Sequence, residues 1–161
     1  MRIAALALLL SVLTAGAATA DDAKDIRKTY DKFCSAIQSQ NFAALHAIVT
    51  PDFTVREGAR KLSLSQEVAA LKQQFSTKGK VRFMRFAIRT ISPHGKTAEV
   101  TTNFWYQAYV PVPNGAGKPH VTDRVGSTED TLVKTAGGWK FKTLSLTTLS
   151  VSVDGKRLNS H

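Results

Sequence analysis

The sequence predicts an α+β domain in which helices cover one face of an antiparallel sheet. Between residues 22 and 76, apolar residues recur at helical spacing. From residue 81 onwards the chain is rich in Val, Thr, Ile, Phe, Trp and Tyr, and turn signals divide it into four long segments. Helices followed by strands in hairpin succession, rather than helices alternating with strands, are typical of this fold class.

Length and composition set the first limits. The 161 residues are enough for one domain and a short targeting segment. Lysine and arginine outnumber aspartate and glutamate by 22 to 12, so the formal net charge is +10. The single cysteine, Cys34, excludes an intramolecular disulfide framework and a cysteine-rich zinc site. Because it lies in a helical pattern beside Phe33, we expect a buried small hydrophobe rather than a reactive thiol.

Residues 1–20 are predicted to be a secretory signal peptide. Arg2 precedes an apolar run over residues 3–13, and Ala18-Thr19-Ala20 has the small-x-small pattern of a cleavage site. The run is shorter than the ~20 apolar residues that a membrane span needs. We therefore expect a secreted or periplasmic bacterial protein whose mature domain is 21–161, with no membrane span after cleavage. The alternative is an uncleaved N-terminal anchor.

Two helices are predicted before residue 50. One covers residues 22–40, and the other follows Asn41, a suitable N-cap. The apolar face of the first consists of Ile26, Tyr30, Phe33, Cys34 and Ile37. That of the second consists of Phe42, Leu45 and Ile48. We expect Thr50-Pro51-Asp52 to end the second helix, because the residue before a proline disfavours helical geometry.

A third helix is predicted over residues 64–76. Ser63 and Gln66 form a capping-box pair at its start, and Lys78-Gly79-Lys80 supplies a C-terminal glycine and positive charge. A short strand over residues 53–55, ending before a turn at Gly58, is expected ahead of it.

Four long strands complete the predicted fold. They are expected over residues 81–92, 97–110, 121–135 and 139–153. The connections between them are Pro93–Lys96, Pro111–Pro119 and Ala136–Gly138, and Asp154-Gly155 marks a last turn. Such long strands twist and curl, so the sheet is expected to wrap around the helices and leave a concave mouth.

This order, together with three local motifs, resembles the nuclear transport factor 2-like superfamily. The motifs are Asn41-Phe42-Ala43-Ala44-Leu45, Pro51-Asp52-Phe53 and Gly137-Gly138-Trp139-Lys140-Phe141. Over residues 22–152 the chain is most similar to secreted SnoaL-like or ketosteroid-isomerase-like bacterial proteins. The resemblance implies a cone-shaped fold, with three N-terminal helices wrapped by a strongly curved antiparallel sheet and a pocket at the wide end. Members include isomerases, dehydratases, polyketide cyclases and non-catalytic binding or dimerising modules.

The resemblance also allows a test of the steroid isomerase residues. It puts Glu57 at the position of the general base, but Phe33 at the position of a hydrogen-bonding tyrosine, and phenylalanine cannot donate that bond. Tyr30 lies about one helical turn away. Near the position of the second acid stand Asn103 and Trp105, neither of which is a carboxylic acid. One role of three survives, which argues against steroid isomerase chemistry.

The dehydratases of the superfamily use His, Asp and Tyr side chains. In this chain similar groups are available at His46, Tyr106, Tyr109 and either Glu129 or Asp130. The candidate catalytic residues are therefore Glu57, His46 and Tyr30. Each has a plainer interpretation: Glu57 as a solvated loop carboxylate, His46 as a structural or surface histidine.

Ligand-binding candidates come from the aromatic segment and a basic strand. Alternation puts Phe104 and Tyr106 on one face of the strand, and Asn103, Trp105, Gln107 and Tyr109 on the other. Arg85 and Arg89 are predicted to share a face that Arg82 opposes. Facing inward they would select an anionic ligand such as a carboxylate, and facing outward they would form a solvated surface. The candidate ligand-binding residues are Phe33, Trp105, Tyr106, Tyr109, Arg85 and Asn103.

These observations predict a secreted domain that binds a small apolar or amphipathic ligand or acts as a dimerising module, with a homodimer expected. The alternative is a SnoaL-like isomerase, cyclase or dehydratase that uses Glu, His and Tyr for proton transfer. A third hypothesis is an interaction protein whose cone is filled. Four scattered histidines lack metal-ligand spacing, so no metal and no cofactor are expected. Despite the positive charge, no nucleic-acid module is recognised in the sequence, so we expect attraction to an anionic envelope, polymer or acidic partner rather than to nucleic acid.

Overall fold

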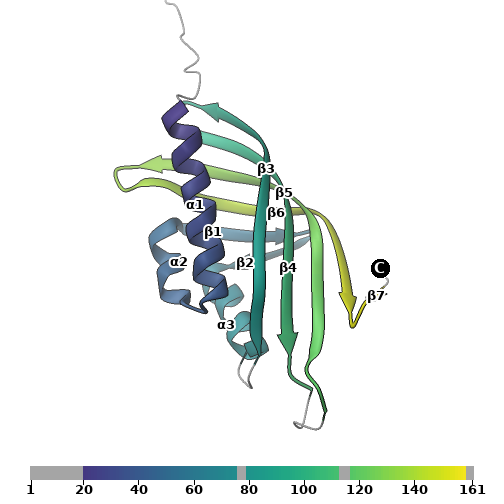
Figure 1. Cartoon of the computed structure of the whole chain (residues 1–161). Coiled ribbons are helices and arrows are strands. Elements are labelled where there is room, and N and C mark those ends of the chain that lie inside the picture. The colour runs from purple at the N-terminus through teal and green to yellow at the C-terminus, as the bar shows by residue number, and fades with distance from the viewer. Residues whose placement is uncertain (1–19, 76–78, 113–116, 159–161) are drawn as a thin grey trace, which may run out of the picture.

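The computed structural model describes residues 20–75, 79–112 and 117–158 (Figure 1). Within these residues, three helices lie against the concave side of a curved sheet of seven strands. The predicted α+β class and cone-like arrangement are confirmed. The predicted signal peptide lies outside the described residues, apart from Ala20. So do residues 76–78, at the end of the predicted third helix, and residues 113–116 of the predicted Pro111–Pro119 connection.

The predicted helices are all present. They are α1 (Ala20–Gln38), α2 (Phe42–Ile48) and α3 (Leu64–Phe75). The first ends before the predicted residue 40 because Gln40 adopts a left-handed conformation, with φ 55°. Asn41 then caps α2, its side chain accepting a hydrogen bond from the backbone N–H of Ala44 at 3.4 Å.

The capping box at the start of α3 is confirmed in both directions. The Ser63 N–H donates to Gln66 Oε1 at 2.9 Å, and the Gln66 N–H donates to Ser63 Oγ at 3.3 Å. Of the predicted C-terminal signal, Lys80 already belongs to the next strand.

The sheet consists of β1 (Val49–Glu57), β2 (Arg60–Ser63), β3 (Lys80–His94), β4 (Thr97–Val110), β5 (His120–Thr135), β6 (Gly138–Val153) and β7 (Lys156–Leu158). The strand order is β2-β1-β6-β5-β4-β3, with β7 beside β6. The four long strands pair as successive antiparallel hairpins, as predicted. The purely antiparallel sheet is a wrong prediction at one place, because β1 pairs with β6 in parallel. After α3 the chain crosses to the far edge of the sheet, and three hairpins bring β6 back beside β1.

The first strand is longer than predicted, and two short strands were not predicted. β1 begins directly after α2, so residues 50–52 belong to a strand instead of merely ending a helix. Pro51 is tolerated there because the pairing of β1 with β6 is irregular between Val49 and Thr54, where no ladder N–H is needed. The turn at Gly58, with φ 56°, leads into β2.

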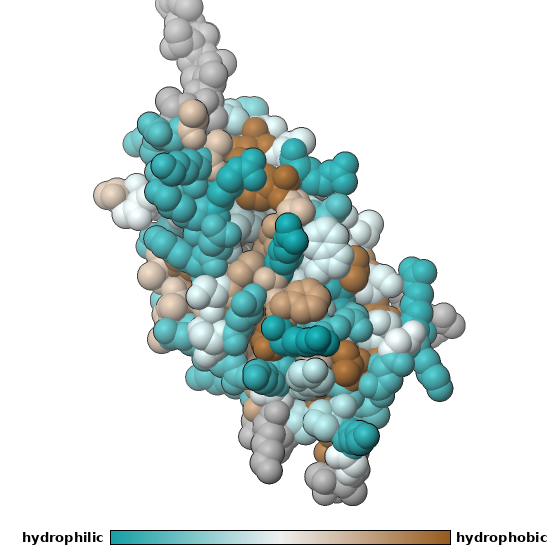
Figure 2. All heavy atoms as spheres, in the orientation of Figure 1, coloured by the Kyte–Doolittle hydropathy of each residue, from teal (hydrophilic) through white to brown (hydrophobic). Residues whose placement is uncertain are grey.

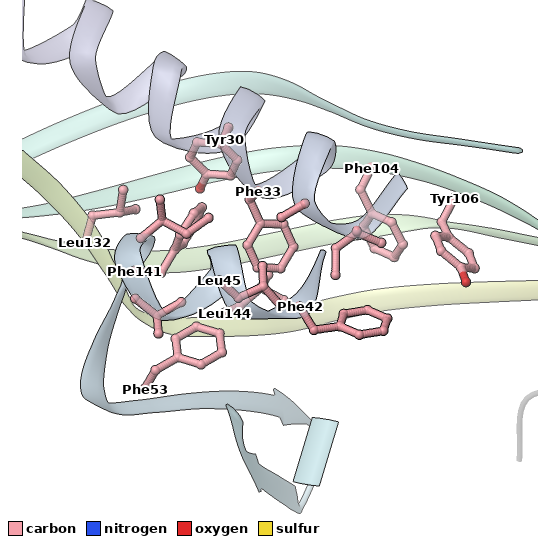
Figure 3. Close-up of a cluster of buried hydrophobic side chains, with 14 of the residues drawn as sticks. Tyr30, Phe33, Phe42, Leu45, Phe53, Phe104, Tyr106, Leu132, Phe141 and Leu144 are labelled. Atoms are coloured by element: carbon pink, nitrogen blue, oxygen red, sulfur yellow. The ribbon is translucent and has the colours of Figure 1, made fainter. Parts of the chain in front are cut away.

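The core lies between α1 and the inner face of the long strands (Figure 3). The Tyr30 ring packs edge-on against Phe141 with centroids 4.8 Å apart, and Phe33 lies 5.3 Å from the same ring. Along β4 every second residue from Ala98 to Ala108 is buried. The prediction that Phe104 and Tyr106 share the packed face is therefore confirmed.

Irregular pairing of β3 contradicts the prediction that Arg82 and Arg85 lie on opposite faces of the strand. The pairing of β3 with β4 shifts between Val81 and Phe83, which adds a residue to β3. The Arg82 Nη1 consequently donates to Gln107 Oε1 at 2.9 Å on the outer face of the sheet. Arg85, which pairs in register with Trp105, is on that same outer face. The two arginines do not oppose each other, and Arg85 does not enter the cone.

Candidate functional site

A cavity of about 370 Å³ lies between the helices and the inner face of the sheet, which we call the cone cavity. Its walls are mainly apolar and come from all three helices and from strands β1 to β6, including Phe33, Ile37, Phe53, Leu71, Phe104 and Leu144. The volume falls within the ~300–1,000 Å³ range of ligand pockets. The filled-cone hypothesis is therefore wrong for this structure.

Polar groups gather at one end of the cone cavity, which we call the mouth. The mouth consists of Glu57, Arg60, Glu67, Gln74, Tyr106 and Arg124. Three of these, Glu57, Arg60 and Arg124, are exposed and mark where the cavity opens to solvent. An apolar interior with polar groups at one end suits an amphipathic molecule.

Local structure explains how the mouth is assembled. The turn at Gly58 makes Glu57 and Arg60 direct partners across the β1–β2 hairpin. On α3, Glu67 and Gln74 occupy the same helical face as Leu64 and Leu71, with spacings of three and four residues. Tyr106 and Arg124 are register partners on β4 and β5.

Tyr106 is the most unusual group in the mouth. The residue is 7% exposed, and its buried hydroxyl makes no hydrogen bond within the described part of the chain. Figure 3 shows its side chain pointing from β4 into the interior that Phe104 also enters. Burial raises the pKa of Tyr106 to about 12, although the positive charge of Arg124 and the nearby Gln74 side chain act in the opposite direction. A buried hydroxyl without a partner costs free energy, so its presence calls for an explanation.

The charges of the mouth are not paired with one another. The Arg124 guanidinium lies 5.9 Å from the centroid of the Tyr106 ring, in cation–π range. Burial, with a smaller effect from Glu57, raises the pKa of Glu67, while Arg124 and Arg60 lower it. The ion pairs within residues 20–75, 79–112 and 117–158 all lie elsewhere. The mouth thus holds two carboxylates and two guanidiniums with hydrogen-bonding capacity to spare.

The opposite situation holds at the closed end of the cone. There the Tyr30 hydroxyl donates to Asp130 Oδ2 at 2.7 Å, Thr128 Oγ1 donates to the same oxygen at 2.7 Å, and the Ser145 N–H donates to Oδ1 at 3.2 Å. A further bond of 2.8 Å joins the hydroxyls of Thr128 and Thr102. Burial raises the pKa of Asp130 to about 6 despite these three donors. Of this network only Thr128 borders the cone cavity.

The structure brings three of the predicted site residues to the cone cavity. Glu57, Phe33 and Tyr106 line it. Tyr30 faces Asp130 instead, and His46 is exposed on α2. The dehydratase-like set of His46, Tyr106 and Asp130 therefore does not converge.

The remaining predicted ligand-binding residues lie outside the cone cavity. Asn103 and Trp105 border a shallow hollow on the outer face of the sheet, and Tyr109 does not line the cavity. Arg85 borders a groove between α1 and β3, which also holds Cys34. Figure 2 views this side and shows apolar patches beside the polar surface of α1. Burial raises the pKa of the Cys34 thiol to about 11, which keeps it protonated.

Sequence analysis missed four residues of the mouth, namely Arg60, Glu67, Gln74 and Arg124. A signal existed for two of them. Glu67 and Gln74 follow the periodicity of Leu64 and Leu71, so they are polar residues on a packed helical face. In the sequence, Arg60 and Arg124 have the pattern of solvated surface residues. Only the folded, curved sheet brings them to the same mouth.

The described residues were also searched for a metal-binding cluster and for a membrane-spanning helix. None of their His, Cys, Asp and Glu side chains form a group of three or more that could hold a metal ion. No helix among them is long and apolar enough to cross a membrane.

Comparison with known proteins then places the chain in a family. A family model for a SnoaL-like domain matches residues 18–145. The chain belongs to the SnoaL-like domain family. None of the curated proteins matches this SnoaL-like sequence.

Solved structures agree with the fold of this SnoaL-like chain. A conserved protein from Planctomyces limnophilus aligns with a TM-score of 0.67 at 15% identity, over 79% of this chain and 95% of that one. A nuclear transport factor 2-like superfamily protein from Salmonella enterica has a TM-score of 0.62 at 14% identity, over 89% and 96%. A candidate scytalone dehydratase from Novosphingobium aromaticivorans has a TM-score of 0.61 at 18% identity, over 82% and 87%. At these identities the similarity establishes the nuclear transport factor 2-like cone fold alone.

Proposed function

We propose that this SnoaL-like domain is exported and binds a small amphipathic ligand, with the apolar body inside the cone cavity and the polar end at the mouth. The observation that carries the proposal is the Tyr106 hydroxyl, which is buried at the boundary between apolar walls and polar mouth and has no partner in the described residues. A ligand atom that accepts its hydrogen bond would remove the cost of leaving it unpaired.

The surroundings of this hydroxyl support binding. The apolar walls below it would remain in contact with water in an empty cone, and covering them with a ligand is favourable by about 25 cal/mol per Å². The unpaired charges above it would orient the ligand, so that its polar end stays in the mouth.

Native mass spectrometry of the protein purified from its own secretory compartment tests the proposal. We expect extra mass that disappears on denaturation, and a polypeptide mass that begins at Asp21. A bare mass, together with an unchanged melting temperature across a panel of amphipathic compounds, would refute ligand binding. A polypeptide that retains residues 1–20 would refute cleavage of the signal peptide.

A second candidate function is proton-transfer catalysis at the mouth. It is favoured by the position of two carboxylates, Glu57 and Glu67, in the cavity that Tyr106 also lines. The raised pKa of Glu67 moves that carboxyl group toward the range of a general acid or base at neutral pH. The ligand recovered from the protein would be incubated with it in D₂O. Deuterium incorporation that Glu67→Gln or Glu57→Gln abolishes would establish catalysis, whereas its absence in the unmutated protein would leave binding alone.

A third proposal concerns the outer face of the sheet, where we expect a homodimer to form. Phe83 and Val125 are large apolar residues with 40% and 42% exposure, and Val125 pairs in register with Trp105. Light scattering on the mature protein is expected to give the mass of a dimer, and Val125→Asp is expected to give the mass of a monomer. A monomeric unmutated protein would contradict the proposal.

A further inference from the structure

We infer that the mouth selects a carboxylate, so that the ligand of the cone is an amphipathic organic acid. The inference rests on the proposed binding function and adds the chemical class of the polar end. It assigns the carboxylate to the Tyr106 hydroxyl and the Arg124 guanidinium, with Arg60 as a second cation across the mouth.

The first step is the match between two neighbouring donors. Tyr106 and Arg124 are direct partners on adjacent strands, and the guanidinium lies 5.9 Å from the tyrosine ring centroid. Both side chains point into the cone cavity. An arginine has only donors, and a tyrosine hydroxyl with a pKa of about 12 stays protonated and donates at neutral pH. A carboxylate offers two oxygens, enough to accept from both groups at once.

The second step concerns the competing carboxylates of the protein. Glu57 and Glu67 border the same mouth, but neither makes an ion pair with Arg60 or Arg124 in the described residues. The carboxylates of the protein therefore do not occupy the guanidinium donors. They do oppose a second negative charge, which favours a ligand with one carboxylate over one with several.

The third step excludes the other head groups. A cationic head would meet Arg60 and Arg124 at close range and leave the Tyr106 hydroxyl without an acceptor. A neutral amide or alcohol would satisfy that hydroxyl but would gain little from either guanidinium. Charge-assisted hydrogen bonds are roughly twice as strong as neutral ones, so the acid is the preferred partner.

The test measures the binding of two matched pairs of ligands to the mature protein, residues 21–161, by isothermal titration calorimetry. The pairs are 2-naphthoic acid with 2-naphthamide, and decanoic acid with decanamide, so that each pair shares an apolar body. We expect the acid of at least one pair to bind about tenfold or more tightly than its amide. Equal affinity within both pairs would overturn the carboxylate assignment and leave the proposed binding function intact. Failure of all four compounds to bind would count against both.

Variants locate the selectivity within the mouth. Arg124→Met is expected to lower the affinity for the acid by about tenfold or more and the affinity for the amide by less than threefold. Arg124→Lys is expected to retain part of the affinity for the acid, because it keeps the charge. Arg85→Met is the matched control, since Arg85 is exposed outside the cone cavity and should leave both affinities unchanged. Glu67→Gln is expected to strengthen binding of the acid by severalfold, because it removes a like charge. Equal losses for acid and amide in Arg124→Met would contradict the assignment, as would an acid affinity that Arg124→Met leaves unchanged.

Discussion

Two buried tyrosines of the cone differ in the hydrogen bonding of their hydroxyl groups. Tyr30 and Tyr106 are 2% and 7% exposed, and both pack among aromatic core residues. The Tyr30 hydroxyl donates to a buried carboxylate, whereas the Tyr106 hydroxyl has no partner in the described chain. The closed end of the cone satisfies its own hydrogen bonds, and we propose that a ligand completes the open end. On this proposal, the closed end contributes to stability and the open end to binding.

Strand β5 connects these two regions. Its inward positions run from Arg124 at the mouth through Gly126 and Thr128 to Asp130 at the closed end. At Gly126 the strand has no side chain, which allows the Phe104 ring and the backbone carbonyl of Thr148 to approach closely. The predictions below test the difference between the two ends, from the largest expected effect to the smallest.

Gly126→Ala is expected to destabilise both ends of the cone at once. A β-carbon at this position would lie 2.8 Å from Cε1 of Phe104 and would also meet the Thr148 carbonyl oxygen, which is backbone and cannot move alone. We expect a loss of more than about 3 kcal/mol in the free energy of unfolding, measured by urea denaturation. Gly137→Ala is the control, because its β-carbon would have only the Thr135 hydroxyl within range, at 3.8 Å. Equal stability of the two variants would contradict this account of β5.

Asp130 is expected to make stability depend on pH. Its pKa is raised from 3.8 to about 6 in the folded protein, so the carboxyl group contributes most to stability when protonated, below about pH 4. This contribution is lost as the pH rises through about 6, and about two pKa units correspond to roughly 3 kcal/mol. We would measure unfolding of the unmutated protein and of Asp130→Asn between pH 4 and 7. The free energy of unfolding of the unmutated protein, minus that of Asp130→Asn, should fall with rising pH. A constant or rising difference would contradict the assignment of the raised pKa to Asp130.

Tyr30→Phe is expected to destabilise the protein by about 2 kcal/mol at neutral pH. The phenylalanine ring retains the contacts with Phe86 and Phe141 but removes one of the three donors to the buried Asp130 carboxylate. Urea denaturation would measure the loss. A change of less than about 0.5 kcal/mol would mean that the hydrogen-bond network does not stabilise the closed end.

Tyr106→Phe is expected to leave the free energy of unfolding unchanged or to raise it by up to about 1 kcal/mol, because it removes a buried hydroxyl that has no partner in the described residues. The same denaturation experiment serves for both tyrosines, and each variant is the control for the other. A loss at Tyr106 as large as that at Tyr30 would show that the Tyr106 hydroxyl has a structural partner within the protein.

The fold follows from the sequence where the pattern is local. The capping box at Ser63 and Gln66 and the alternation along β4 depend on neighbouring residues, and both were predicted correctly. The parallel pairing of β1 with β6 and the bulge at Arg82 depend on contacts between distant segments, so periodicity could not predict them. A single extra residue at a bulge reverses the faces of every residue after it.

The candidate site was less predictable for the same reason. Glu57 and Tyr106 were singled out individually, but the mouth is made from several elements that meet only in the folded cone. Arg124 looks like a solvated residue in the sequence, and the register of β5 with β4 turns it toward Tyr106. The role of Tyr30 was also hidden, because its partner Asp130 is a hundred residues away along the chain.

The most direct test of this account is the melting temperature of the unmutated protein, Tyr30→Phe and Tyr106→Phe, each with and without 2-naphthoic acid and decanoic acid. Without ligand, Tyr30→Phe should melt at a lower temperature than the unmutated protein, and Tyr106→Phe should melt at the same temperature or higher. With the bound acid, the unmutated protein and Tyr30→Phe should gain the same increase, and Tyr106→Phe should gain clearly less. Equal increases in all three proteins, or a smaller increase in Tyr30→Phe alone, would contradict the assignment of the open end to binding and the closed end to stability.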